Sequence, residues 1–286
     1  MNDFRLLQKE PPETGNKYRK EYLDGVDKLI LDRYEKAKEI RKNNVKNVFE
    51  NPEECRDKMR EMLGWPLVDE SDKSYTVKKE FVREDNGVKI YRVQITILGC
   101  LPVYGMMFIT DESSDAPMII AAHGGLGAPE LCAGLLEVGT INYNHMVERV
   151  LNYKVNIFAP QFLNWNIQRF KVADEHMEVG AVYEMRIARD RRLQQLGSSI
   201  TALEIFGVQR AIDYLIESGL AREDKIGMLG LSYGGFYTLF TAALDTRIKA
   251  SLSCSFFNDR VKRIDFTPDW TWKNAANTLL DAEILS

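Results

Sequence analysis

The sequence predicts an α/β fold in which a mostly parallel, doubly wound sheet follows antiparallel strands and a helical amino-terminal segment. Continuous apolar runs occupy residues 118–122, 155–159, 226–231 and 248–257. Such runs are typical of strands that are buried on both faces. Helical stretches such as residues 198–218 separate them. Strands that alternate with helices pair in parallel and carry helices on both faces, so the second half of the chain is predicted to be doubly wound.

A helical segment precedes the strands. The apolar residues of a first helix recur at three- and four-residue steps, at Leu23, Val26, Ile30, Tyr34, Ala37 and Ile40. We expect one face of this amphipathic helix to pack and the other to face water. Asn51 and Pro52 are typical of the start of a second helix, and Gly64 can end it. Residues 1–70 are therefore predicted to form a helical lead-in, and residues 71–286 an α/β domain.

Three strands of a different character lie between the helices and the first buried run. Residues 77–83, 88–98 and 103–110 are rich in β-branched and aromatic side chains. The Asp-Asn-Gly sequence at residues 85–87 is a strong hairpin signal. These residues predict an antiparallel meander ahead of the parallel strands.

Composition excludes several classes of partner and site. The 286 residues are 45% hydrophobic and 28% charged, with a formal net charge of −4, so nucleic acid and anionic membranes are poor partners. We expect a small, weakly charged substrate and no nucleic acid or membrane partner. The polar amino terminus and the lack of a long apolar run predict a cytoplasmic protein. The four cysteines are widely separated and lack the spacing of metal ligands, so neither a metal nor a cofactor is expected.

The first chemical motif is the sequence Gly-Leu-Ser-Tyr-Gly-Gly at residues 230–235, between a predicted strand and a predicted helix. A nucleophile on a sharp strand-to-helix turn needs small neighbours, and glycines stand two residues before and two after Ser232. The helix end favours negative charge, so the N–H of Tyr233 is the expected first oxyanion donor. The alternatives are an ordinary glycine-rich turn and a phosphate-binding loop. The second is disfavoured because no Gly-x-Gly-x-x-Gly or Gly-Lys-Ser/Thr is present.

The second motif is the sequence His123-Gly124-Gly125, which follows the first buried strand. Glycines allow the backbone to approach a substrate oxygen closely, and the N–H of Gly124 or Gly125 can be the second oxyanion donor. A plain turn is the alternative interpretation. We expect His123 to order this loop and not to act as general base, because its strand precedes the strand that carries Ser232.

Taken together, these motifs resemble the α/β-hydrolase superfamily. The resemblance rests on the two motifs, on Leu-Gly-Trp-Pro at residues 63–66, and on residues 270–283, and it covers roughly residues 52–286. The acetyl-xylan-esterase, dienelactone-hydrolase and prolyl-oligopeptidase-like branch is the most similar. The resemblance implies an α/β-hydrolase fold and a Ser-Asp/Glu-His triad, in which acid and histidine follow later strands. Ser232 is the residue that it carries over.

The triad acid and base that the resemblance implies are not identifiable, because no histidine follows the strand after Ser232. Three interpretations remain open. The chain is a truncated product or gene fragment of a longer esterase, C-terminally incomplete. Alternatively, His176 or His145 serves Ser232, with Asp259 as the acid. The third interpretation is a non-catalytic relative that binds a ligand or partner.

Each of these candidates also has a simpler interpretation. His176 stands among acidic residues and fits a solvated loop, and His145 fits a helix face. Asp259 fits an ion pair with a nearby arginine. The charged helix at residues 186–192 is predicted to be solvent-exposed, although its arginines could border the substrate mouth.

The sequence therefore favours a carboxylic ester hydrolase that acts on a small-molecule ester by acyl transfer through Ser232. A non-catalytic binding module is the first alternative. In that case the last strand would present an exposed sheet edge, through which a homo-oligomer could form. An oligopeptidase-like serine peptidase is the second alternative, because Ser-Tyr-Gly-Gly-Phe is common in that branch; without a preceding propeller it ranks below the esterase.

Overall fold

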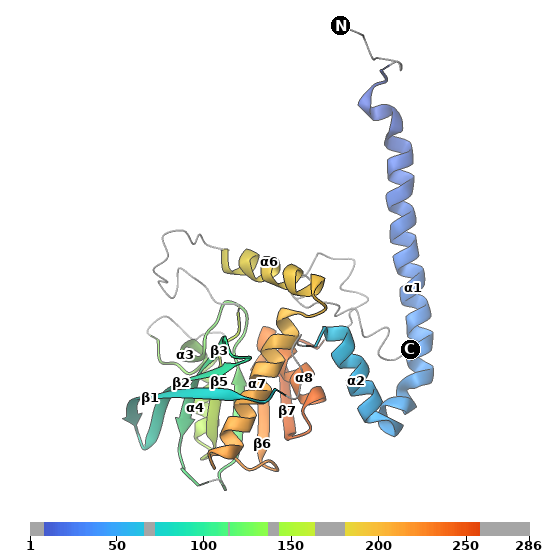
Figure 1. The fold of residues 1–286 in the computed structure, drawn as a ribbon. Helices are drawn as coiled ribbons and strands as arrows, with labels where there is room; N and C mark the ends of the chain where they lie inside the picture. Colours follow the sequence, from blue (N-terminus) through green and yellow to red (C-terminus); the bar gives the residue numbers. More distant parts are fainter. Residues whose placement is uncertain (1–8, 66–71, 114, 137–142, 164–180, 258–286) are drawn as a thin grey trace. The chain divides into compact units, whose positions relative to one another are not determined.

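A computed structural model describes residues 9–65, 72–113, 115–136, 143–163 and 181–257 of the chain (Figure 1). In chain order its elements are the 3₁₀ turn Pro12–Gly15, α1 (Asn16–Glu50), α2 (Pro52–Leu63), β1 (Tyr75–Asp85), β2 (Val88–Ile97), β3 (Leu101–Ile109), β4 (Met118–Ala122), α3 (Pro129–Cys132), α4 (Met146–Leu151), β5 (Asn156–Pro160), α6 (Ala181–Gln195), α7 (Ile200–Glu217), β6 (Ile226–Leu231), α8 (Tyr233–Leu244) and β7 (Ile248–Cys254). All seven predicted strands are present, and β7 ends at Cys254, before the predicted end at Phe257.

The chain divides into two compact units, and the division falls between Cys55 and Arg56, within α2. This division lies earlier than the boundary near residue 70 that the sequence predicts. The last turns of α2 belong to the second unit, where Arg56 Nε donates to the carbonyl oxygen of Ala243 at 2.9 Å. Gly64 follows with a φ of +66°, a left-handed conformation in which helices commonly end.

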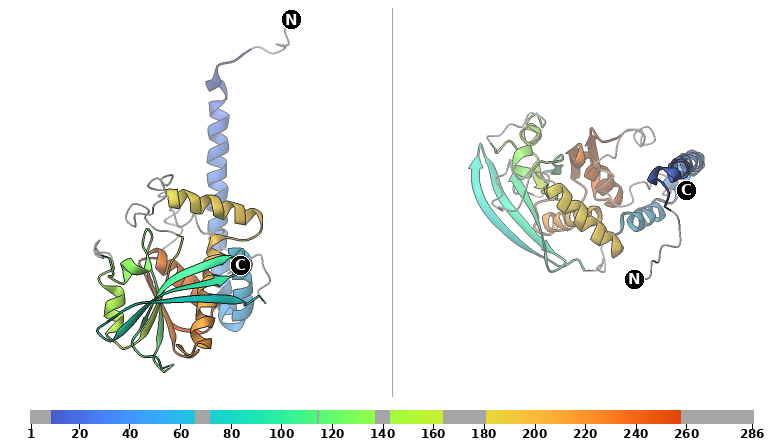
Figure 2. Two further views of the ribbon diagram at one scale, coloured as in Figure 1. Left: turned by 60° about the vertical axis from the view of Figure 1, so that its left-hand side comes forward. Right: turned by 90° about the horizontal axis from the view of Figure 1, so that it is seen from above.

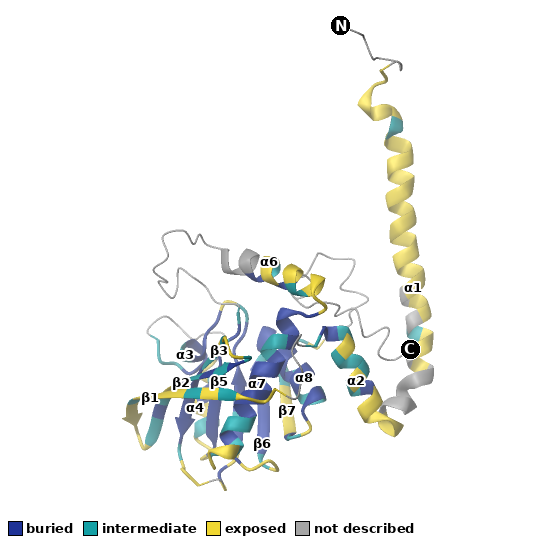
Figure 3. Cartoon of the chain, viewed as in Figure 1, coloured by how far each residue is buried: buried dark blue, intermediate teal, exposed yellow. Residues whose placement is uncertain are grey.

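Helix α1 forms as predicted, and the described residues of its apolar stripe are exposed. Leu23 is 62% exposed and Ile30 is 41% exposed, and Figure 3 shows most of the described residues of the helix as exposed. Ion pairs between neighbouring turns support the helix, as between Lys20 and Asp24 at 2.6 Å. Such exposed pairs each contribute only about 0.3–0.5 kcal/mol. The packed face that the sequence predicts for this helix stays a prediction.

The second unit is built on a seven-stranded sheet in the order β1-β2-β3-β5-β4-β6-β7. Strands β1, β2, β3 and β5 pair antiparallel in turn, whereas β5, β4, β6 and β7 pair in parallel. Figure 2 shows the strong twist of the antiparallel meander. The predicted α/β class, with antiparallel strands ahead of a parallel sheet, is confirmed.

Helices cover both faces of this sheet. One core cluster includes side chains of α7 and α8, such as Ile205 and Phe236, and the other includes Leu131 of α3 and Val147 of α4. The central strands lie between these layers, and Figure 3 shows them as buried. The carboxyl ends of the parallel strands all lie at one edge of the sheet. In folds of this class, ligands bind at that edge.

Strand β7 lies at one end of the described sheet and pairs there only with β6. Its residues 249–252 are exposed, and Leu252 is 60% exposed. An open edge of this kind can pair with another chain, so a homo-oligomer formed through β7 stays a prediction. In the described part of the chain, no helix combines the length and apolar character needed to cross a membrane.

Candidate active site

Ser232 lies on a sharp turn between the end of β6 and the start of α8. Its φ of +55° and ψ of −110° lie outside the conformations that L residues adopt without strain. Backbone hydrogen bonds fix the turn on both sides. The N–H of Ser232 donates to the carbonyl oxygen of Cys254 at 2.7 Å, and the N–H of Phe236 donates to that of Ser232 at 3.0 Å. The half-buried serine thus lies at the amino end of α8, where the helix dipole favours negative charge.

The two glycines that flank Ser232 are required by close backbone packing. A Cβ atom on Gly230 would lie 2.2 Å from the carbonyl oxygen of Gly234. A Cβ atom on Gly234 would lie 2.1 Å from the carbonyl oxygen of Ala122. Any side chain at either position would force β4, β6 or α8 apart. The glycine spacing therefore has a steric cause and is not a chance match to a pattern.

The loop after β4 faces this turn. A Cβ atom on Gly124 would lie 3.8 Å from Cβ of Ser232 and 3.2 Å from the carbonyl oxygen of Leu231. The N–H of Gly124 donates to Oη of Tyr143 at 2.9 Å. Of the two predicted second oxyanion donors, Gly124 is thus engaged within the protein in this structure. The structure gives no such bond for the half-buried Gly125.

His123 is fully buried behind this loop, and both of its ring nitrogens are engaged. The neutral tautomer that fits donates from Nδ1 to the carbonyl oxygen of Gly124 at 2.7 Å. Its Nε2 then accepts from the N–H of Phe162 and from Nε2 of Gln161, each at 2.9 Å. Burial lowers the pKa of His123 to about 4, so the ring is neutral near pH 7. This geometry supports the prediction that His123 orders the loop.

The other acid and base candidates are not brought to Ser232 among the described residues. His145 is not on a helix face but precedes α4 with a φ of +56°, and its Nδ1 lies 2.7 Å from Oε2 of Glu148. His176 and Asp259 lie outside the described residues, and so does the expected arginine partner of Asp259. Within the described residues no hydrogen bond joins Ser232 Oγ to another side chain, and no cluster of histidine, cysteine, aspartate and glutamate could hold a metal ion.

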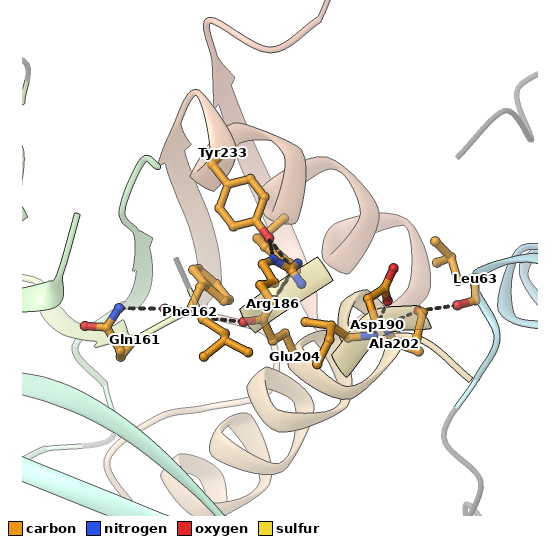
Figure 4. Close-up of polar contacts among 12 residues, drawn as sticks. Leu63, Gln161, Phe162, Arg186, Asp190, Ala202, Glu204 and Tyr233 are labelled. Carbon is orange, nitrogen blue, oxygen red and sulfur yellow. Dashed lines mark hydrogen bonds and ion pairs between the residues drawn. The ribbon is translucent and has the colours of Figure 1, made fainter. Parts of the chain in front are cut away.

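A buried polar network that the sequence does not predict lies beneath the turn (Figure 4). Arg186 of α6 donates from Nε to Oη of Tyr233 at 2.6 Å and from Nη2 to Oη of Tyr237 at 2.8 Å. The same Nη2 lies 3.1 Å from Oε2 of Glu204 on α7. Glu204 also accepts from the hydroxyl of Tyr237 and from the N–H of Leu163. Burial raises the pKa of both tyrosines, so they stay protonated hydrogen-bond donors.

The prediction that the arginines of α6 face solvent is wrong at Arg186. Arg189, Arg191 and Arg192 are exposed as expected, whereas Arg186 has no exposed surface. Its two tyrosine partners follow 47 and 51 residues later in the chain. No local pattern distinguishes the four arginines, because burial of the first depends on how α6 packs against α7 and α8.

A cavity of about 690 Å³ lies at the same edge of the sheet. Most of its wall is apolar and includes Val103, Phe162, Leu203 and Val208. A volume of this size suits a small organic ligand. Gln161 also lines the cavity and contacts His123, which immediately precedes the loop that faces Ser232. Gln161 therefore contributes both to the cavity wall and to the hydrogen bonds of His123.

The chain is similar to solved esterase structures at low sequence identity. A putative acetyl xylan esterase from Bacteroides fragilis has a TM-score of 0.56 and 17% identity, over 84% of this chain and 66% of that protein. A protein described as a methylesterase has a TM-score of 0.51 and 16% identity, over 72% of this chain and 41% of that protein. No protein-family model and no curated protein matches the sequence. The structural similarities show that this chain has the α/β-hydrolase fold.

The close packing at the turn predicts that Gly234→Ala destabilises the protein. The new methyl group would lie 2.1 Å from a backbone oxygen, so β4 and α8 must separate. We expect the free energy of unfolding to fall by about 3 kcal/mol, as measured by urea denaturation. Gly25→Ala is the matched control, because a Cβ there meets nothing within 4 Å. Equal losses in the two variants would contradict the steric explanation.

The buried, neutral His123 predicts a pH-dependent contribution to stability. Its pKa is 6.5 when unperturbed and about 4 in the folded protein. Between these values the unfolded state holds the extra proton. The free energy of unfolding therefore falls by about 3 kcal/mol as the pH falls from 6.5 to 4. We expect His123→Gln to lose this component of the pH dependence in urea denaturation. The exposed His145 provides the control, since His145→Gln should keep the wild-type slope. If His123→Gln also keeps that slope, His123 is not the buried neutral base described.

Proposed function

We propose that the chain is a serine hydrolase that cleaves a carboxylic ester of a small molecule through Ser232. The observation that carries this proposal is the strained turn at Ser232, which is held at the amino end of α8 with the loop after β4 opposite. Local strain at a residue that the surrounding backbone fixes so tightly is typical of functional sites. Both solved structures named above are described as esterases, which favours esters over other acyl compounds.

In the proposed mechanism, Ser232 Oγ attacks the ester carbonyl carbon and forms a tetrahedral intermediate. The N–H groups of Tyr233 and Gly125 donate to its oxyanion, and the dipole of α8 adds to this stabilisation. Collapse of the intermediate expels the alcohol and leaves an acyl-serine, which water then hydrolyses. The proton of Ser232 requires a general base, for which His176, with Asp259 as acid, stays the predicted candidate within this chain.

We further propose that the cavity beside Gln161 receives one apolar substituent of the ester. Its wall is mainly apolar, and it lies at the carboxyl edge of the parallel strands, where Ser232 also lies. Leu203 projects from α7 into this wall. Such a cavity would favour esters with a longer chain or a ring over an acetyl group alone.

Covalent labelling tests the nucleophile. We expect a fluorophosphonate to label the wild-type protein stoichiometrically and Ser232→Ala not at all, as measured by intact mass. Ser218→Ala is the control, because Ser218 lies in an exposed position after α7 and should leave labelling unchanged. Absence of labelling in well-folded wild-type protein would contradict an activated serine and favour the non-catalytic binding module. Turnover of peptide substrates but not of p-nitrophenyl acetate would favour the serine peptidase.

Filling the cavity tests the substrate proposal. We expect Leu203→Trp to lower kcat/KM for p-nitrophenyl octanoate about 10-fold or more and to leave that for p-nitrophenyl acetate within twofold, because the indole occupies space for the longer chain. Leu196→Trp makes the same change at a residue that is 62% exposed and should alter neither value. Equal losses for both esters in Leu203→Trp would show that the cavity does not select the substituent.

A further inference from the structure

We propose that the buried ion pair between Arg186 and Glu204 holds both halves of the oxyanion site in register, so that both are positioning residues for the reaction. This inference rests on the proposed ester hydrolysis. It assigns to Arg186 and Glu204 a role in the reaction that they perform by positioning the backbone N–H groups of Tyr233 and Gly125.

The first half of the oxyanion site, the N–H of Tyr233, is held through the side chain of the same residue. Arg186 Nε donates to Oη of Tyr233 at 2.6 Å, and its Nη2 donates to Oη of Tyr237 at 2.8 Å, one helical turn further along α8. The guanidinium carbon also lies 5.4 Å from the centre of the Tyr233 ring. One planar, rigid group thus fixes two side chains on the first turns of α8 (Figure 4). The position of the Tyr233 N–H follows from that of the helix end.

The second half is held through Glu204. Its carboxylate accepts from the guanidinium and from the N–H of Leu163 in the segment after β5. In the same segment, the N–H of Phe162 donates to Nε2 of His123 at 2.9 Å. Through Nδ1, His123 then holds the loop that carries Gly125. Hydrogen bonds, together with the backbone between Phe162 and Leu163, therefore link the guanidinium to both sides of the proposed oxyanion site.

Stability alone does not account for this arrangement. Arg186 has no exposed surface, and its Nη1 has no hydrogen-bond partner within the described part of the chain. Desolvating a guanidinium is unfavourable. Apolar residues of similar volume often replace a buried ion pair without loss of stability. The presence of this ion pair despite its unfavourable desolvation is explained if its fixed geometry serves the reaction.

The test compares three variants with the wild type. Arg186→Lys keeps the charge but replaces the two nitrogens that contact Tyr233, Tyr237 and Glu204 by a single ammonium on a flexible stem. Arg186→Met with Glu204→Leu removes the pair and both charges together. Arg192→Met, at an exposed arginine of the same helix, is the control.

We expect the rate constant for fluorophosphonate labelling and kcat for p-nitrophenyl acetate to fall about 10- to 100-fold in Arg186→Lys, with KM within twofold. The double variant should recover the wild-type thermal midpoint but not kcat, and the control should change nothing.

A second measurement does not depend on activity. We expect amide hydrogen exchange in Arg186→Lys to accelerate in both residues 123–128 and residues 230–236, because both are held by the same ion pair. If the wild type is not labelled at Ser232 but both segments loosen together, the proposed hydrolysis fails and the linkage between the two segments stands. The positioning role is overturned if exchange in these segments is unchanged, or if the double variant regains wild-type kcat together with its thermal midpoint.

Discussion

The turn at Ser232 depends on how closely three stretches of backbone approach one another. The carbonyl oxygen of Ala122 lies against Gly234, and that of Gly234 lies against Gly230, with no room for a Cβ atom at either glycine. This approach brings the end of β4 against the start of α8. It therefore places the loop after β4 opposite Ser232, and it sets the strained backbone of the serine itself.

Two buried groups of different charge maintain the site around this turn. His123 is neutral and uses both nitrogens to join the loop after β4 to the segment after β5. Arg186 is charged and joins α8 to α7 through Glu204. Among the described residues, neither side chain is hydrogen-bonded to Ser232. Their arrangement indicates that the positions of backbone N–H groups, which carry no side-chain chemistry of their own, are set by side chains one layer further away.

The sequence predicts the parts of this site that are local and does not predict those that depend on packing. The strands and the turn are identifiable because strand periodicity and the spacing of Gly230, Ser232 and Gly234 are contained in a few consecutive residues. The burial of Arg186 is not identifiable, because its partners lie on other helices and exposed arginines follow it in the sequence. In the same way, the periodicity of α1 shows an apolar face but not what covers it.

The most direct test of the central claim is an experimental structure of the protein after reaction with a small fluorophosphonate. A nucleophile on this turn predicts a bond from Ser232 Oγ to phosphorus and a phosphoryl oxygen about 2.7–3.1 Å from the backbone nitrogen of Tyr233. An adduct on another residue would contradict the assignment of Ser232. A phosphoryl oxygen on Ser232 that meets no backbone N–H at the amino end of α8 would contradict the oxyanion site.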